Sequence, residues 1–436
     1  MRAHLVRTAL PLAVALAAAP AAAQIPLTPR ALGMGGASYV AAARGQEALF
    51  LNPANLGLPG QPHWSFALPQ LAAGETTVGI GFGDLLDFIE YGDLEDDRKA
   101  EILAEIPDQG TELAADIRVP LAAIQLRRVA VGVSYAVVGN HTVEKDLVDL
   151  LLNGVDQTRL IGGGYDVAGI RENTDGFRAT FLDFAAGYGN RVGPVALGVT
   201  GHYYRGTDLV RSGVTAVDPQ IADQDVEVRY SGVRREGGNG FGLDVGAAFQ
   251  PTPALTISAS IGNLVNTFEW DDQLRFREVI VNREDYESGD LNDLNSEYVQ
   301  NETDYDGTTA SAAVQALAAD IDVDTKLPRT LRAGAAFKPG TGTTVAVGLQ
   351  TNLDESRLAG IYDEGFSLGV QQQVAILGLR AGIAKVGDGN LLSAGLSVGP
   401  IHLGLARVNT GDYAGADRKG WIATFGLGTS SQSTMP

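Results

Sequence analysis

The chain has 436 residues, and its 52 acidic residues outnumber 32 Lys and Arg, which gives a formal net charge of −20. An acidic chain of this kind repels phosphate backbones, so nucleic acid is excluded as a partner. The chain has no cysteine, which excludes a disulfide framework and a thiolate zinc site. Its stability must therefore come from apolar burial and hydrogen-bonded layers.

The first segment has the pattern of a cleaved export signal. Two arginines precede the apolar run "TALPLAVALAAAPAAA", and the small residues at 21–23 fit a cleavage site before Gln24. A membrane anchor is disfavoured, because Pro11 and Pro20 interrupt the run and it is shorter than the roughly 20 residues that span a bilayer. The sequence predicts a signal peptide over residues 1–23 and an exported mature chain.

The next segment, residues 24–75, contains the glycine-rich stretch "RALGMGGASYVAAARGQEALFLNPANLG". Glycine permits backbone conformations and close approaches that side chains forbid, and Asn-Pro-Ala is typical of a turn. We interpret the segment as a plug inside a barrel; the alternative is a first strand and loop of the wall. The predicted plug turns contain Gly33, Gly35, Gly36, Asn52, Pro53 and Ala54.

From about residue 76 onward, short segments alternate bulky apolar residues with small ones. In "VAVGVSYAVV", for example, the bulky residues Val129, Val131 and Val133 enclose Ala130 and Gly132. A period of two predicts strands. The second face of a soluble sandwich would be charged and wet, whereas here it is small, which favours a transmembrane barrel whose bulky face meets lipid. The inner face should then be small and polar.

The spacing of the candidate strands supports a bacterial barrel. Short and long connections alternate, as in barrels with short periplasmic turns and longer outer loops. Such barrels have an even number of strands, so we omit the candidate "HWSFALPQ" and start the wall at "TTVGIGFG". This predicts an all-β, antiparallel barrel of about 14 strands over residues 76–436. Two of its outer stretches, 84–116 and 271–306, hold twelve acidic residues each.

These residues also carry a resemblance to a known superfamily. The stretch "ALGMGGA…ALFLNPANLG" resembles the amino-terminal signature of the superfamily that contains FadL-type fatty-acid channels, PorV-type outer-membrane proteins and TraF-like proteins. The segments "EDDRKAEILAEIPDQGTELAAD", "KDLVDLLLNG", "GPVALGVTGHYYRG" and "ISASIGNLVN" resemble an uncharacterised family of outer-membrane barrels within it. The resemblance implies a fourteen-stranded barrel with an amino-terminal hatch, located in the outer membrane.

Charged residues in the predicted interior do not form a catalytic motif. His202 and His402 should face the lumen, but no nucleophile elbow or paired catalytic motif lies near them, so we expect no enzyme. The acids of "NETDYDG" resemble the start of a calcium loop, but Ala313 stands where the terminal acid is needed, so we expect no metal and no cofactor. Alternation places four charges inward: Asp183, Asp244, Arg332 and Arg380.

Two classes of function remain open. The first is a passive, plug-gated channel for a small hydrophobic molecule, with an apolar pocket near the hatch. The second is a non-transporting barrel that serves as an interaction or secretion-accessory platform, binding a surface protein through its acidic outer loops. In both, outer-membrane lipid surrounds the wall. The pocket would be formed by Leu32, Met34, Tyr39, Phe50 and Leu51.

Overall fold

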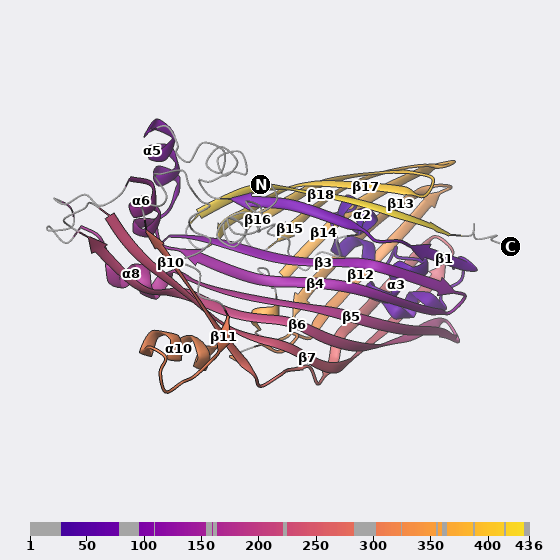
Figure 1. Ribbon diagram of the computed structural model, residues 1–436. Helices are drawn as coiled ribbons and strands as arrows, with labels where there is room; N and C mark the ends of the chain where they lie inside the picture. The colour runs from indigo at the N-terminus through magenta and orange to yellow at the C-terminus, as the bar shows by residue number, and fades with distance from the viewer. Residues whose placement is uncertain are drawn as a thin grey trace, which may run out of the picture.

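The computed structural model describes residues 28–77, 96–108, 110–153, 159, 164–220, 225–282, 302–323, 325–354, 356–359, 364–386, 389–413 and 416–430. The predicted signal peptide lies outside these residues. They form a closed antiparallel barrel of 14 strands (Figure 1), which confirms the predicted fold class. No helix in the described part of the chain is long and apolar enough to cross a bilayer.

Each strand of the wall pairs with its neighbours in sequence order, and β1 and β18 close the ring. The insertion of β9 to β11 is bypassed, because β8 pairs directly with β12. The wall strands are β1 (Trp64–Ala67) with β2 (Leu71–Thr77), β3 (Thr111–Leu126), β4 (Val129–Val143), β5 (Asp175–Val192), β6 (Val195–Gln220), β7 (Asp225–Thr252), β8 (Leu255–Asn266), β12 (Thr330–Gly340), β13 (Thr343–Asn352), β14 (Glu364–Val374), β15 (Leu377–Val386), β16 (Gly389–Val398), β17 (Ile401–Tyr413) and β18 (Ala416–Ser430).

The wall begins earlier than the expected boundary at residue 76. Both β1 and β2 pair with β18, Ala67 opposite Gly428 and Leu71 opposite Phe425, so together they form the first strand. The break between them falls at Pro69, which has no N–H to donate to a neighbouring strand. The omitted segment "HWSFALPQ" therefore belongs to the same strand as Leu71–Thr77. The count of fourteen holds because two candidates are one strand.

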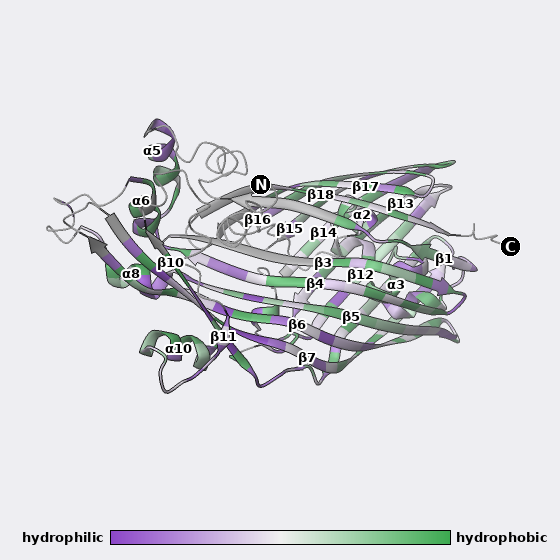
Figure 2. Cartoon of the chain, viewed as in Figure 1, coloured by the Kyte–Doolittle hydropathy of each residue, from purple (hydrophilic) through white to green (hydrophobic). Residues whose placement is uncertain are grey.

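Burial along the strands follows the predicted alternation. Along β4, Ala130 and Ala136 are buried whereas Val129 and Val131 are about half exposed, and Figure 2 shows polar and apolar residues interleaved along the wall. Exposed bulky residues also occur on other strands, including Leu197, Val199, Ile257, Leu368 and Phe425. The bulky face therefore points outward, and the small face points into the lumen.

Aromatic side chains mark the limits of the outward apolar band. Phe184, Tyr203 and Phe241 are exposed and stand side by side on β5, β6 and β7, with ring centroids 6.2 and 5.5 Å apart. Phe249 lies further along β7, close to the turn that leads to β8. At about 3.3 Å per residue and a tilt of about 40°, the stretch from Phe241 to Phe249 rises by about 20 Å. This height agrees with the apolar band of a transmembrane barrel.

The two ends of the barrel differ. Turns of a few residues join the strands at one end, which we call the short-turn end, and long insertions join them at the other, the long-loop end (Figure 1). The alternation of short and long connections predicts a loop at 205–239, but residues 205–220 and 225–239 prolong β6 and β7 beyond the aromatic row as paired strands. The insertions contain α5 (Asp96–Glu105), α6 (Lys145–Asn153), α8 (Val167–Asn173), β9 (Glu269–Trp270), β10 (Leu274–Asn282), β11 (Thr303–Asp304), α10 (Ala312–Asp320) and η6 (Arg357–Ala359).

The segment before β1 folds into short helices inside the barrel. In Figure 1, these helices occupy the half of the lumen at the short-turn end. Nearly all residues from Pro29 to Leu58 are buried, and their neighbours belong to strands on opposite sides of the ring. We call residues 28–58 the plug. Its elements are α2 (Pro29–Gly33), η2 (Ala37–Val40), η3 (Gly45–Glu47), α3 (Ala48–Leu51) and η4 (Pro53–Gly57).

Candidate functional site

The plug rests on wall glycines whose missing side chains make room for it. A Cβ on Gly382 of β15 or Gly369 of β14 would overlap the plug backbone at Met34. A Cβ on Gly198 of β6 would overlap the backbone at Pro53 on the opposite side of the ring. The small inner face that the sequence shows is therefore a seat for the plug rather than the lining of an open pore.

Residues of the predicted plug turns contact the wall. Gly35 and Gly36 have φ of +80° and +82°, which favours glycine, and Gly33 packs against Gly395 with no space for a Cβ. Asn52 Oδ1 accepts a hydrogen bond from the Ala54 N–H at 3.0 Å, and Pro53 begins η4. The Asn52 amide donates to the carbonyls of two wall residues, Ala247 at 3.3 Å and Ala259 at 3.1 Å.

The five residues of the predicted ligand pocket are packed rather than arranged around a space. Leu32, Met34, Tyr39 and Leu51 are all at most 5% exposed. Met34, Tyr39 and Leu51 belong to one cluster with Ala336 and Ala346 of the wall, whereas Phe50 packs against a second cluster. In this state of the plug, a ligand would have to displace these side chains.

A polar network, not foreseen from the sequence, links the plug to the wall. Glu47 accepts hydrogen bonds from the Tyr39 hydroxyl at 2.6 Å and from Arg30 at 3.4 Å. The Arg30 guanidinium also lies 3.1 Å from His402 Nε2 on β17. His402 Nδ1 is 2.7 Å from the Ser397 hydroxyl, which accepts from Arg380 at 2.6 Å. The sequence signal for this network is the presence of two charged residues, Arg30 and Glu47, in a segment of small and apolar residues.

The four predicted inward charges are divided between two places. Asp183 and Asp244 lie on either side of His202, whose Nδ1 is 2.8 Å from Asp183 and whose Nε2 is 3.3 Å from Asp244. Arg332 belongs to the same place, because Arg332 and Asp244 both border Gly262, and it donates to Gln350 Oε1 at 2.9 Å on neighbouring β13. Arg380 donates to Gln371 at 2.8 Å and joins the polar network at the plug. Neither Asp183 nor Asp244 forms a hydrogen bond to the plug in the described residues.

The part of the lumen towards the long-loop end is apolar and aromatic, unlike the small, polar interior expected. Phe181 packs against Tyr204 and Phe268, with ring centroids 6.0 and 5.9 Å away. Beside Phe181 the register between β5 and β6 shifts, because Thr207 is an extra residue on β6. A Cβ on Gly240 would overlap the Phe268 backbone, and one on Gly206 would approach the Trp270 ring. Glycines thus also seat these two aromatic residues, which come from the β8 to β12 insertion.

Ion pairs hold this insertion, which we call the outer cap (residues 267–282 and 302–329), against the barrel. Asp320 at the end of α10 accepts from Arg211 of β6 at 2.7 Å and from Arg357 of η6 at 3.0 Å. Arg235 of β7 donates to both carboxylate oxygens of Asp322, at 2.8 and 2.6 Å. Burial opposes ionisation of Asp320, but the hydrogen bonds from Arg357 and Arg211 outweigh it and lower the pKa of its carboxyl.

The acids that resemble a calcium loop do not converge on a common point. Glu302 pairs with Arg234 and Asp304 with Arg275, while Asp306 accepts from the Thr308 N–H at 2.9 Å. No group of three His, Asp or Glu side chains in the described residues could hold a metal ion.

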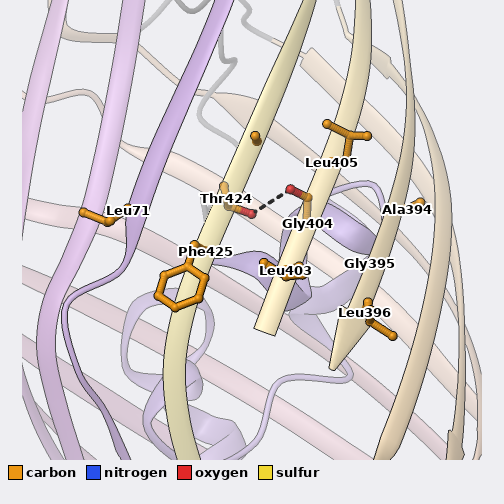
Figure 3. Close-up of a pocket in the computed structure, with 10 residues that line it drawn as sticks. Leu71, Ala394, Gly395, Leu396, Leu403, Gly404, Leu405, Thr424 and Phe425 are labelled. Carbon is orange, nitrogen blue, oxygen red and sulfur yellow. Dashed lines mark hydrogen bonds between the residues drawn. The ribbon is translucent and has the colours of Figure 1, made fainter. Parts of the chain in front are cut away.

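One surface groove, with a volume of about 490 Å³, lies on the outward face of β16, β17, β18 and β2 (Figure 3). Leu396, Leu403, Leu405 and Phe425 project around small residues, and the Thr424 hydroxyl donates to the Gly404 carbonyl at 3.4 Å. The groove lies on the outer surface of the wall rather than in the lumen, so it contributes no opening to the interior.

Comparison with known proteins identifies the fold. The chain is similar to the toluene transporter TbuX of Ralstonia pickettii (14% identity, 93% of this chain and 98% of that one, TM-score 0.50). It is also similar to the toluene transporter TodX of Pseudomonas putida (12%, 94% and 98%, 0.50) and to the monoaromatic hydrocarbon channel CymD (13%, 94% and 99%, 0.50). No protein-family model and no curated protein matches the chain. The predicted FadL-like barrel is thus confirmed as a fold.

Proposed function

Because the chain has a FadL-like barrel fold, we propose that it is an outer-membrane protein that passively conducts a small hydrophobic molecule past its plug. The short-turn end would then face the periplasm, as the short turns of bacterial barrels do, and the acidic long-loop end would face outward. The signal at residues 1–23 would direct export and be cleaved. The plug would close the periplasmic half of the lumen.

The observation that carries this proposal is the way in which the plug is attached. No backbone hydrogen bond joins residues 28–58 to the wall strands among the residues that the structure describes. The links are side-chain hydrogen bonds, such as Ser260 Oγ to the Leu51 carbonyl at 2.8 Å, together with contacts at wall glycines. The plug can therefore shift without breaking any backbone pairing of the sheet, which a segment of the wall could not do.

The chemistry of the lumen supports an apolar ligand. Aromatic side chains, including Phe181, Tyr204 and Phe268, line the lumen on the long-loop side of the plug. Once the plug moves, its residues Leu32, Met34 and Leu51 would become accessible in the half of the lumen at the short-turn end. Apolar contacts of this kind recognise a hydrocarbon by burial rather than by directed hydrogen bonds. Three barrels of the same fold are described as transporters or channels for toluene or monoaromatic hydrocarbons.

The alternative is a barrel that transports nothing and binds a surface protein through its outer loops. It is favoured by one observation: the outer cap packs its own apolar residues into the lumen, so the described barrel is filled at both ends. In that case the polar network at the plug and the pair of Asp183 and Asp244 around His202 would only satisfy buried charges.

Uptake of toluene by cells that express the chain distinguishes the two. We expect faster uptake than in cells with an empty vector, and faster still with Glu47→Gln, which removes the charge that holds Arg30 and Tyr39. Glu236→Gln, at an exposed position on β7, removes the same charge away from the plug and should behave as wild type. Uptake at the empty-vector rate for both wild type and Glu47→Gln, with both folded, would reject the channel.

A further inference from the structure

Three arginines form a patch on two neighbouring turns at the short-turn end. Arg127 and Arg128 make the turn between β3 and β4, and Arg191 precedes the turn between β5 and β6. Asn190 joins the two turns, because its Oδ1 accepts from Arg128 Nη1 at 2.6 Å and from the Arg191 N–H at 2.9 Å. All three arginines are exposed.

No carboxylate neutralises this patch within the described part of the chain. None of the three arginines forms an ion pair there, although the chain as a whole carries a net charge of −20. The six short turns and the strand residues beside them contain no Asp or Glu. The cations of this end are therefore available to an anion from outside the chain.

Apolar side chains border the patch on the side of the bilayer. Leu126 is 59% exposed and Val192 61%, and both lie next to an arginine in the sequence. The exposed rings of Trp64 and Tyr188 stand at the same end, as aromatic residues do at membrane interfaces. An acidic soluble protein would need the cations but not this apolar border, whereas a lipid uses both.

We propose that Arg127, Arg128 and Arg191 bind the headgroup phosphate of an anionic phospholipid in the leaflet at the short-turn end. A guanidinium donates two parallel hydrogen bonds to phosphate oxygens, and the patch supplies three such groups on two turns that Asn190 holds together. The acyl chains of the same lipid lie against Leu126 and Val192. The site lies outside the lumen and does not depend on transport.

The test compares two double variants by native mass spectrometry after extraction with equal amounts of phosphatidylglycerol and phosphatidylcholine. Arg127→Asn with Arg191→Gln removes two charges from the patch; Asn suits position 127 because φ there is +54°. The control, Arg205→Gln with Arg407→Gln, removes two exposed outward arginines from β6 and β17. A gel shift on heating verifies that both variants fold.

We expect wild type and control to retain phosphatidylglycerol in preference to phosphatidylcholine, and the patch variant to lose this preference by a factor on the order of five per arginine. If both variants lost the preference for phosphatidylglycerol equally, net charge alone would explain it, and the proposal would be overturned. An unchanged preference in the patch variant would also overturn it, leaving an acidic periplasmic protein as the class of partner to seek.

Discussion

A single position on a strand has a role that is set by the face on which it lies. Inward positions next to the plug require glycine, because any Cβ at Gly382 or Gly369 would overlap the plug backbone. If the barrel lies in a membrane as proposed, outward positions should tolerate a charge according to their depth in the bilayer. A charge there costs most at the midplane and little at the interface.

Val199 and Val192 test the outward face at two depths. Val199 is 47% exposed on β6 and lies midway between the aromatic row at Tyr203 and the turn, whereas Val192 is 61% exposed at the short-turn end. We expect Val199→Arg to destabilise the folded barrel by about 2–4 kcal/mol and Val192→Arg by about 0–1 kcal/mol. Urea unfolding in lipid vesicles measures both. Equal costs would place the bilayer elsewhere on the wall.

Among the elements, the outer cap is attached to the barrel by several ion pairs. Its attachment includes Asp320, which two arginines hold in the ionised form, and Asp322, which pairs with Arg235. The lowered pKa of Asp320 means that the folded state favours the carboxylate more than the unfolded state does. Its contribution to the stability of the cap is therefore complete above the ordinary pKa of 3.8 and is lost as the pH falls below that value.

Acidification should therefore loosen α10 before the wall unfolds. We expect amide hydrogen exchange in α10 to accelerate relative to exchange in β13 and β14 when the pH falls from 6 to 3, after correction for the intrinsic rate. At pH 6, Asp320→Asn should produce the same relative acceleration, because it removes the charge that Arg211 and Arg357 bind. Protection that is unaltered by both treatments would show that the apolar cluster alone holds the cap.

At the scale of the whole molecule, the wall forms a closed sheet without the plug. The sheet closes between β18 and the strand formed by β1 and β2, and no residue of the plug takes part in that pairing. Deletion of residues 25–58 should therefore leave a barrel that still migrates faster unheated than boiled in detergent gels. It should also conduct small ions in planar bilayers, whereas the full chain should be silent. Failure of the truncated chain to insert would make the plug part of the wall.

The sequence predicted the repeated part of the molecule well. Alternation follows directly from strand geometry, so segments such as "VAVGVSYAVV" indicated both the strand and its lipid face. The start of the wall was misplaced, because Pro69 divides the first strand into two short pieces that look like separate candidates. The extension of β6 and β7 was missed because both of its faces carry polar residues beyond the aromatic row, and the alternation that indicates a strand weakens there.

The candidate site was harder to predict than the wall. The turns at Gly35 and Asn52 have local signatures, and the inward direction of Asp183 and Arg380 follows from the period of two. The contacts between Arg30, Glu47 and His402 join residues that are far apart in the chain, which no local pattern records. The aromatic cluster joins the inward side chains Phe181 and Tyr204 to Phe268 of the outer cap, and a contact between segments so far apart in the chain leaves no local pattern.

The seating of the plug on opposite sides of the ring has a consequence for biogenesis. Pro53 rests on Gly198 of β6, and Met34 rests on Gly369 and Gly382 of β14 and β15. A folded plug touching both sides fits too closely to be threaded into a finished cylinder. We therefore expect the sheet to close around the plug during assembly, with the pairing between β18 and the first strand forming last. In that order of assembly, the plug is already in the lumen when the barrel closes.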